Sequence, residues 1–167
     1  MSAKHALPST SLHKQKICAG GLVFYKKDLL IVQSRFSRKW LLPGEAIEGE
    51  ESPAEGLLRS LNEHLNLNAE VGPLLLVDYI HNRDLRGEYL YLLFSVKSLR
   101  EDQAQQIRIN KEVFRDFKIL HPERALELLT PEVSRRLKYT LKNFPLQRQL
   151  AYLENGMEPF FKTDIAL

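Results

Sequence analysis

The feature that most constrains the fold is a helix-start signal followed by regularly spaced leucines. Ser52 and Glu55 have the spacing of a capping box, in which each side chain bonds the other residue's backbone N–H group, and Pro53 suits the first helical position. Asn66 marks the end, because asparagine tolerates the left-handed backbone of a helix terminus. At about 100° per residue, one arc of the helix carries Leu57, Leu58, Leu61 and Leu65. We therefore predict an amphipathic helix from Ser52 to about Leu65, with its leucine side on a core.

The opposite side of the same helix is polar and follows an acidic loop. It carries Gly56, Arg59, Ser60 and Glu63, and the predicted loop from Glu45 to Glu51 precedes it. Glycine leaves the helix backbone accessible, and an arginine and a glutamate on one face can hold a phosphate and a cation. The sequence therefore predicts a ligand site on this face.

Runs rich in β-formers predict strands on both sides of the helix. Ile17–Tyr25 and Leu29–Gln33 flank the turn Lys26-Lys27-Asp28 and have the pattern of a hairpin. Trp40-Leu41-Leu42 is a short apolar run that Pro43-Gly44 ends. Later strands are predicted at Leu74–Ile80, Tyr89–Val96 and Val113–Leu120.

The last third of the chain has leucines at helical spacing. It predicts helices at Pro122–Leu129, Pro131–Lys142 and Leu146–Leu153, with Gly156 as the stop of the last one. Strands around one central helix, followed by terminal helices, predict an α/β/α sandwich with a mixed sheet and extra C-terminal helices. We expect a flexible leader at residues 1–16, the main domain at 17–130 and, at 131–167, a helical extension packed on the same domain.

Composition narrows the class of protein and of partner. With 167 residues, 44% hydrophobic and 27% charged, the chain should form a single globular domain. The net charge of +3 favours phosphorylated ligands, whereas the scatter of basic residues among acids argues against a polynucleotide partner. No apolar run is long enough to cross a bilayer or to serve as a secretory signal. The lone Cys18, expected in the core, is consistent with a reducing compartment, so we expect a cytoplasmic protein without a membrane partner.

The segment from Gly44 to Leu67 resembles the Nudix box, whose pattern is G, five residues, E, seven residues, then R-E-U-x-E-E-x-G-U, with U a bulky aliphatic residue. The positions that fit are Glu51, Arg59, Leu61, Glu63 and Leu67. The positions that depart are Glu45, Ser60, His64 and Asn66. The resemblance covers about residues 17–129, and its context includes Gly20-Gly21, Leu30-Ile31-Val32, Arg35 and Trp40-Leu41-Leu42-Pro43-Gly44.

The resemblance implies the Nudix fold and a metal-dependent pyrophosphatase. In Nudix enzymes the glutamates of R-E-U-x-E-E hold Mg²⁺ or Mn²⁺, which screens the diphosphate and lowers the pKa of the attacking water. This chain keeps Glu63 and has Ser60 and His64 in place of the other two glutamates. By the same resemblance, Glu51 and Arg59 join Glu63 in the catalytic set and hold the loop against the helix.

Other residues are candidates to complete a metal site. His64 is a candidate ligand, although its position on the helix points partly inward and imidazole suits Mg²⁺ poorly. Glu112 and Asp116 lie where many family members place another acidic ligand or base, and we take Glu112 as the candidate ligand. The acidic loop offers Glu45, Glu48 and Glu50 as replacement carboxylates.

Arginines before the box are candidates for substrate binding. Arg35 and Arg38, with Lys39, can contact phosphates, and we place Gly44 in the same candidate set. A solvated turn explains these cations equally well. Aromatic side chains that could stack on a nucleobase, or simply pack, are Tyr79, Tyr89 and Tyr91.

Two functions follow from the resemblance. The first is a hydrolase that cleaves a pyrophosphate bond in a nucleotide or nucleoside diphosphate derivative, with weak or unusual metal dependence. The second is a catalytically inactive Nudix domain that binds a nucleotide or a protein. We favour the hydrolase, and a homodimer remains open. The run Tyr152–Gly156 resembles a tail of some bacterial Nudix proteins, which implies a bacterial source.

Overall fold

The computed structural model describes residues 16–82, 87–143 and 150–159. The predicted leader lies outside them, apart from Lys16, which begins the first strand. The elements are β1 (Lys16–Leu22), β2 (Phe24–Tyr25), β3 (Asp28–Ser34), β4 (Trp40–Leu41), β5 (Gly44–Ala46), α1 (Pro53–Leu65), β6 (Val71–Asn82), β7 (Gly87–Val96), α2 (Glu101–Gln105), β8 (Phe114–Leu120), α3 (Pro122–Leu128), α4 (Pro131–Asn143) and β9 (Ala151–Glu154).

The strands form two sheets. The larger sheet has the order β5-β1-β7-β6-β9 and is mixed, because β1 runs parallel to β7 and β9 runs parallel to β6. In the smaller sheet β3 pairs with β8 along one edge and with β2 and β4 along the other, all antiparallel.

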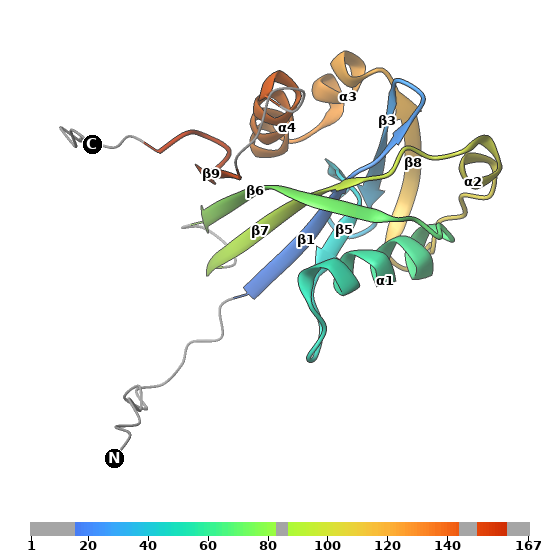
Figure 1. Cartoon of the computed structure of the whole chain (residues 1–167), viewed down its shortest axis with the longest axis horizontal. Coiled ribbons are helices and arrows are strands. Elements are labelled where there is room, and N and C mark those ends of the chain that lie inside the picture. Colours follow the sequence, from blue (N-terminus) through green and yellow to red (C-terminus); the bar gives the residue numbers. More distant parts are fainter. Residues whose placement is uncertain (1–15, 83–86, 144–149, 160–167) are drawn as a thin grey trace.

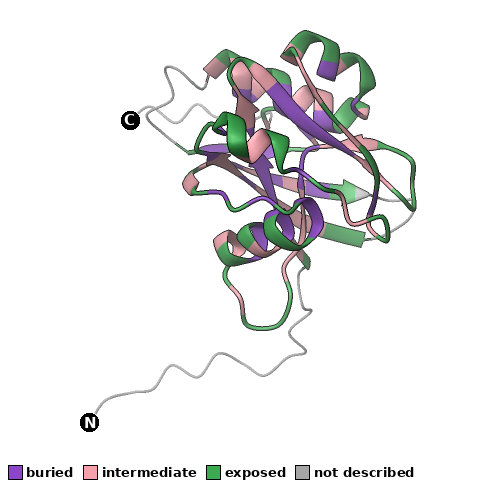
Figure 2. Ribbon diagram, turned by 90° about the vertical axis from the view of Figure 1, so that its right-hand side faces the viewer, coloured by how far each residue is buried: buried purple, intermediate pink, exposed green. Residues whose placement is uncertain are grey.

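Helices cover both faces of these sheets (Figure 1). Along β3, Leu30 and Val32 pack into the core that contains the α1 leucines, whereas Leu29 and Ile31 pack into the core formed with α3 and α4. This alternation is expected of a strand with helices on both sides. Buried residues accordingly lie on the strands and on the inner sides of the helices (Figure 2). The predicted α/β/α sandwich with a mixed sheet is confirmed.

Helix α1 has the predicted ends. The Glu55 backbone N–H donates to Ser52 Oγ at 3.3 Å and the Ser52 N–H donates to Glu55 Oε2 at 2.8 Å. Asn66 caps the other end in the left-handed conformation, with φ of 53°. Three of the four predicted core leucines are fully buried, while Leu58 is partly exposed at the edge of the leucine arc.

The predicted strand Ile17–Tyr25 is wrong as one element. It divides at Val23 into β1 and β2, and only β2 forms the hairpin with β3. Residues 19–22 are all buried, and a strand covered on both faces is suited to an interior place between β5 and β7. The loop predicted from Glu45 is also partly wrong, because Glu45 lies in β5 opposite Ala19.

The predicted helix Leu146–Leu153 is wrong in its described part, which forms β9. Ala151 and Leu153 are buried and Tyr152 and Glu154 exposed, a period of two that satisfies the edge of β6. The prediction at residues 146–149 lies outside the described residues. Gly156, at φ of 74°, lies in the turn after β9, where a Cβ atom would come within 2.8 Å of a backbone oxygen. The short helix α2 was not predicted.

A buried ion pair joins α4 to the larger sheet. Arg136 donates from Nε and Nη2 to Asp78 Oδ2 at 2.9 and 2.8 Å, and the Gly156 N–H donates to Asp78 Oδ1 at 3.0 Å. The guanidinium carbon of Arg136 lies 3.9 Å from the centre of the Tyr91 ring. One carboxylate therefore connects β6, α4 and the turn after β9.

We predict that Asp78→Ala lowers the free energy of unfolding by about 3–5 kcal/mol, because it leaves the Arg136 charge buried without its partner. Chemical denaturation measures this. The control is Glu70→Ala, which removes an exposed partner of Lys97 and should cost no more than about 1 kcal/mol. Equal losses in the two variants would contradict the structural role given to Asp78.

Candidate functional site

Arg59 lies at the centre of a cluster of carboxylates beside α1. Its Nε and Nη2 donate to the two oxygens of Glu51 at 3.0 and 2.8 Å, and its Nη1 donates to Glu45 on β5. These bonds raise the pKa of Arg59, with Glu51 the largest cause. The bidentate contact fixes both the position and the orientation of the guanidinium.

Glu51 holds the segment before α1 against the helix. Its Oε1 also accepts the backbone N–H of Glu48 at 2.7 Å. The hydrogen bond from Arg59, followed by that from Glu48, lowers the pKa of Glu51. A Cβ atom at Gly56 would lie 2.9 Å from both Glu51 Oε1 and Ile47, so glycine at this position allows the segment to approach the helix.

His64 is turned inward and bound to Glu45. Its Nε2 lies 3.1 Å from both oxygens of Glu45, and its ring meets Phe114 edge to face with the ring centres 6.0 Å apart. Only 9% of His64 and 1% of Ser60 is exposed. Within the described part of the chain, His64 Nδ1 and Ser60 Oγ are buried atoms without a hydrogen-bond partner. Two side chains of the predicted site therefore face the interior.

Glu63 and Glu48 form the exposed rim of the cluster. Glu63 Oε2 and Glu48 Oε1 each lie 3.8 Å from Arg59 Nη1, and their side chains are 57% and 72% exposed. α1 thus brings Arg59, Glu63 and His64 together with Glu45 and Glu51, but it presents only Glu63 of the predicted ligands to solvent.

The remaining predicted site residues lie elsewhere. Glu112 is exposed on the turn before β8 and lies 3.9 Å from Nη1 of Arg35, which donates to the Lys111 carbonyl at 2.7 Å. Arg38 is exposed in the turn between β3 and β4, with φ of 58°. Gly44, at φ of 134°, crosses β1 so closely that a Cβ atom would lie 2.1 Å from the Ala19 carbonyl oxygen. The backbone conformation and this close contact explain why position 44 is a glycine, without any role in substrate binding.

Other candidates have packing or surface roles. Tyr91 stacks on Arg136, as described above, and Asp116 accepts the N–H of Phe117 at 2.9 Å. The sequence did not single out Glu45 as the partner of His64. The only signal was an acid at a box position that calls for glycine.

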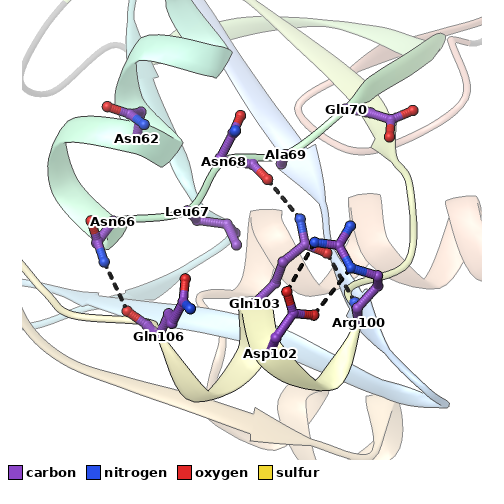
Figure 3. Close-up of a pocket in the computed structure, with 10 residues that line it drawn as sticks. All are labelled: Asn62, Asn66, Leu67, Asn68, Ala69, Glu70, Arg100, Asp102, Gln103 and Gln106. Atoms are coloured by element: carbon purple, nitrogen blue, oxygen red, sulfur yellow. Dashed lines mark hydrogen bonds and ion pairs between the residues drawn. The ribbon is translucent and has the colours of Figure 1, made fainter.

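A surface hollow lies at the C-terminal end of α1 (Figure 3). The predicted site residues do not line it. Its arginine, Arg100, is paired with Asp102 at 3.0 Å, and Gln103 donates to the Asn68 carbonyl at 2.6 Å. Half of the lining residues are Asn or Gln and the one arginine is paired, so the hollow offers little positive charge to a phosphate.

Comparison with known protein families assigns the chain to one of them. The NUDIX domain profile matches residues 14–142. The chain belongs to the Nudix family. Human diphosphoinositol polyphosphate phosphohydrolase 3-beta is 32% identical over 85 residues, which are 50% of this chain and 51% of that protein. The mouse 3-alpha protein is 29% identical over 84 residues, again 50% and 51%. This Nudix chain therefore spans about half the length of these curated relatives.

Solved structures share the fold at low identity. The MutT protein of Methanosarcina mazei has a TM-score of 0.67 and 18% identity, covering 82% of this chain and all 100% of that one. The Nudix domain of Shewanella oneidensis NrtR, solved with ADP ribose, has a TM-score of 0.67 and 19% identity, covering 84% and 94%. A UDP-X diphosphatase has a TM-score of 0.64 and 20% identity, covering 86% and 70%.

The donor set of this Nudix box does not fit a pair of divalent cations. Such cations prefer several free oxygen ligands. Here Glu45 and Glu51 bond Arg59, His64 bonds Glu45, and Ser60 is buried. Across residues 16–82, 87–143 and 150–159, no group of three or more His, Cys, Asp or Glu side chains is arranged to hold a metal ion. In the same ranges, no helix has the length and apolarity to cross a membrane.

We predict that Arg59→Ala destabilises the protein by more than about 0.5 kcal/mol, the usual surface range, because Glu51 and Glu45 lose their shared partner. Because Arg59 lowers the pKa of Glu51, this carboxylate stabilises the fold above its ordinary pKa of 4.5, and the contribution is lost as the pH falls through the lowered value. The gap between wild type and variant should therefore narrow below about pH 4.5.

Denaturant unfolding at a series of pH values measures this gap. Glu63→Gln is the control, since it changes only an exposed carboxylate 3.8 Å from the same guanidinium. A gap that is equally wide at pH 3 and pH 7 would show that Arg59 acts through packing alone.

Proposed function

We propose that this Nudix domain binds a small nucleotide or nucleoside diphosphate derivative and does not hydrolyse it by the two-cation route. The observation that carries this proposal is the contact between His64 and Glu45 at 3.1 Å, which occupies a ligand position of the box with an internal interaction. A Mg²⁺ ion at this position would have to compete with that contact. Imidazole is also a poor ligand for so hard a cation.

The charge of the cluster bears on where the phosphates of a ligand would lie. Four carboxylates surround one guanidinium, which leaves an excess of three negative charges while His64 is neutral. Without cations this face repels a diphosphate. The phosphates of a bound ligand are therefore expected beside the box face, where positive charge is available.

The type of ligand is inferred from the family and the fold. The human relative is named for a diphosphorylated substrate, and a structural neighbour was solved with ADP ribose. The formal charge of +3 agrees with an anionic small molecule. The diphosphate is common to both named ligands, and the nucleoside part is proposed from the ADP-ribose complex alone.

A second candidate is slow hydrolysis with a single cation. It is favoured by the exposed carboxylates of Glu48 and Glu63, which lie 3.8 Å from the same Arg59 nitrogen. In that case one Mn²⁺ or Mg²⁺ would bind between them, and Glu63→Gln would abolish both cation binding and turnover.

We predict binding without turnover. ADP-ribose, ADP, nucleoside triphosphates and a diphosphoinositol polyphosphate are incubated with Mg²⁺, Mn²⁺ or Zn²⁺, and phosphate release is measured with and without added phosphatase. Calorimetry with ADP-ribose in EDTA tests binding. The proposal expects binding in EDTA and no release above the blank. Metal-dependent release that Glu63→Gln removes would instead establish the second candidate.

A further inference from the structure

The turn between β3 and β4 presents an aromatic side chain to solvent. Phe36 is 81% exposed, although a phenylalanine is among the residues with most to gain from burial. The turn is held by backbone bonds from Ser34 to the Lys39 carbonyl at 2.9 Å and from Arg38 to the Ser34 carbonyl at 3.0 Å. Gln33 also donates to the Arg38 carbonyl at 3.0 Å. Phe36 thus projects from a well-bonded turn.

Three cationic residues belong to the same turn as Phe36. Arg35, Arg38 and Lys39 belong to the same exposed turn, and Lys111 is exposed beside it. The Glu112 carboxylate lies 3.9 Å from Arg35 Nη1 and is largely exposed, so it screens Arg35 only weakly. Asp116, also exposed, lies opposite Gln33 on β8. The turn therefore offers positive charge that the box face lacks.

A single segment connects this turn to α1. The Asn110 N–H donates to the His64 carbonyl at 2.8 Å, and the Arg35 N–H donates to the Val113 carbonyl at 2.9 Å. Residues 110–113 therefore contact the end of the box helix on one side and the cationic turn on the other. A ligand on the turn would therefore be linked to the C-terminal end of the box helix through this segment.

We infer that the turn Arg35–Lys39 holds the nucleotide, with Phe36 stacked on the base and Arg35 and Arg38 on the phosphates. The inference rests on the proposed function and specifies where its ligand binds. Stacking on one aromatic ring is available to any base, and the arginine fork matches phosphate oxygens. One ring with a few cations fits a mononucleotide, whereas a longer nucleic acid would require a groove with successive rings.

The experiment compares base-containing and base-free ligands. Trp40, the only tryptophan of the chain, lies one residue beyond the turn, so its fluorescence can report binding of ADP-ribose, ADP and inorganic pyrophosphate. Phe36→Leu keeps an apolar side chain and removes the aromatic face. Arg38→Asn removes a charge and tolerates the left-handed backbone at this position. Tyr152→Leu, on β9 of the other sheet, is the matched control for loss of an exposed aromatic ring.

Phe36→Leu should weaken ADP-ribose and ADP by about fivefold or more and leave pyrophosphate unchanged. Arg38→Asn should weaken all three ligands, and Tyr152→Leu none. Thermal melting verifies that each variant folds. If wild type binds ADP-ribose and Phe36→Leu binds it equally well, this inference is overturned while the proposed function stands. If wild type binds none of the three, the proposed function fails and the inference fails with it.

Discussion

The bidentate contact between Arg59 and Glu51 determines the arrangement of the whole candidate site. It holds the segment before α1 close to the helix, where a Cβ atom at position 56 would lie 2.9 Å from Glu51 Oε1. The third guanidinium nitrogen, Nη1, donates to Glu45, whose carboxylate also lies 3.1 Å from His64 Nε2. Substitution of any of these residues would therefore change the hydrogen bonds or the distances among the remaining side chains.

The departures from the box pattern are physically connected. A glutamate at the glycine position of the box, on a strand that faces α1, needs partners once it is largely removed from water. Arg59 and His64 supply them, and His64 stands at a box position that calls for glutamate. The result is a box that keeps the Arg59–Glu51 contact and uses one of its ligand positions, His64, in an internal contact. Under the proposed function, the negative charge left on this face would direct an anionic ligand toward the cationic turn after β3.

Local signals were sufficient for some parts of this structure. The cap at Ser52, the end at Asn66 and the extent of α3 and α4 depend on residues within a few positions of each other, and they were predictable. The division of the first strand at Val23 and the strand at Ala151–Glu154 depend on pairing with distant strands, and they were not. The leucine spacing near the C-terminus predicted a helix wrongly. The alternation of buried and exposed residues in β9 arises from its pairing with β6 and cannot be read from the local sequence.

The candidate site divides in the same way. The proximity of Arg59, Glu63 and His64 followed from helix geometry. The contact between Glu45 and His64 spans 19 residues and two elements, so its prediction required the register of β5 on β1. The exposure of Phe36 likewise depends on whether other parts of the fold pack against the turn, and the local sequence does not determine this.

The box helix is expected to hold no divalent cation in the wild-type protein, and paramagnetic broadening by Mn²⁺ measures this. Amide signals of ¹⁵N-labelled protein are followed during titration with Mn²⁺, for wild type and for the variant Glu45→Gly, Ser60→Glu, His64→Glu, which restores the box residues. Signals of residues 59–64 should persist at equimolar Mn²⁺ in wild type and broaden in the variant. Broadening centred on Glu63 and His64 in wild type would contradict it.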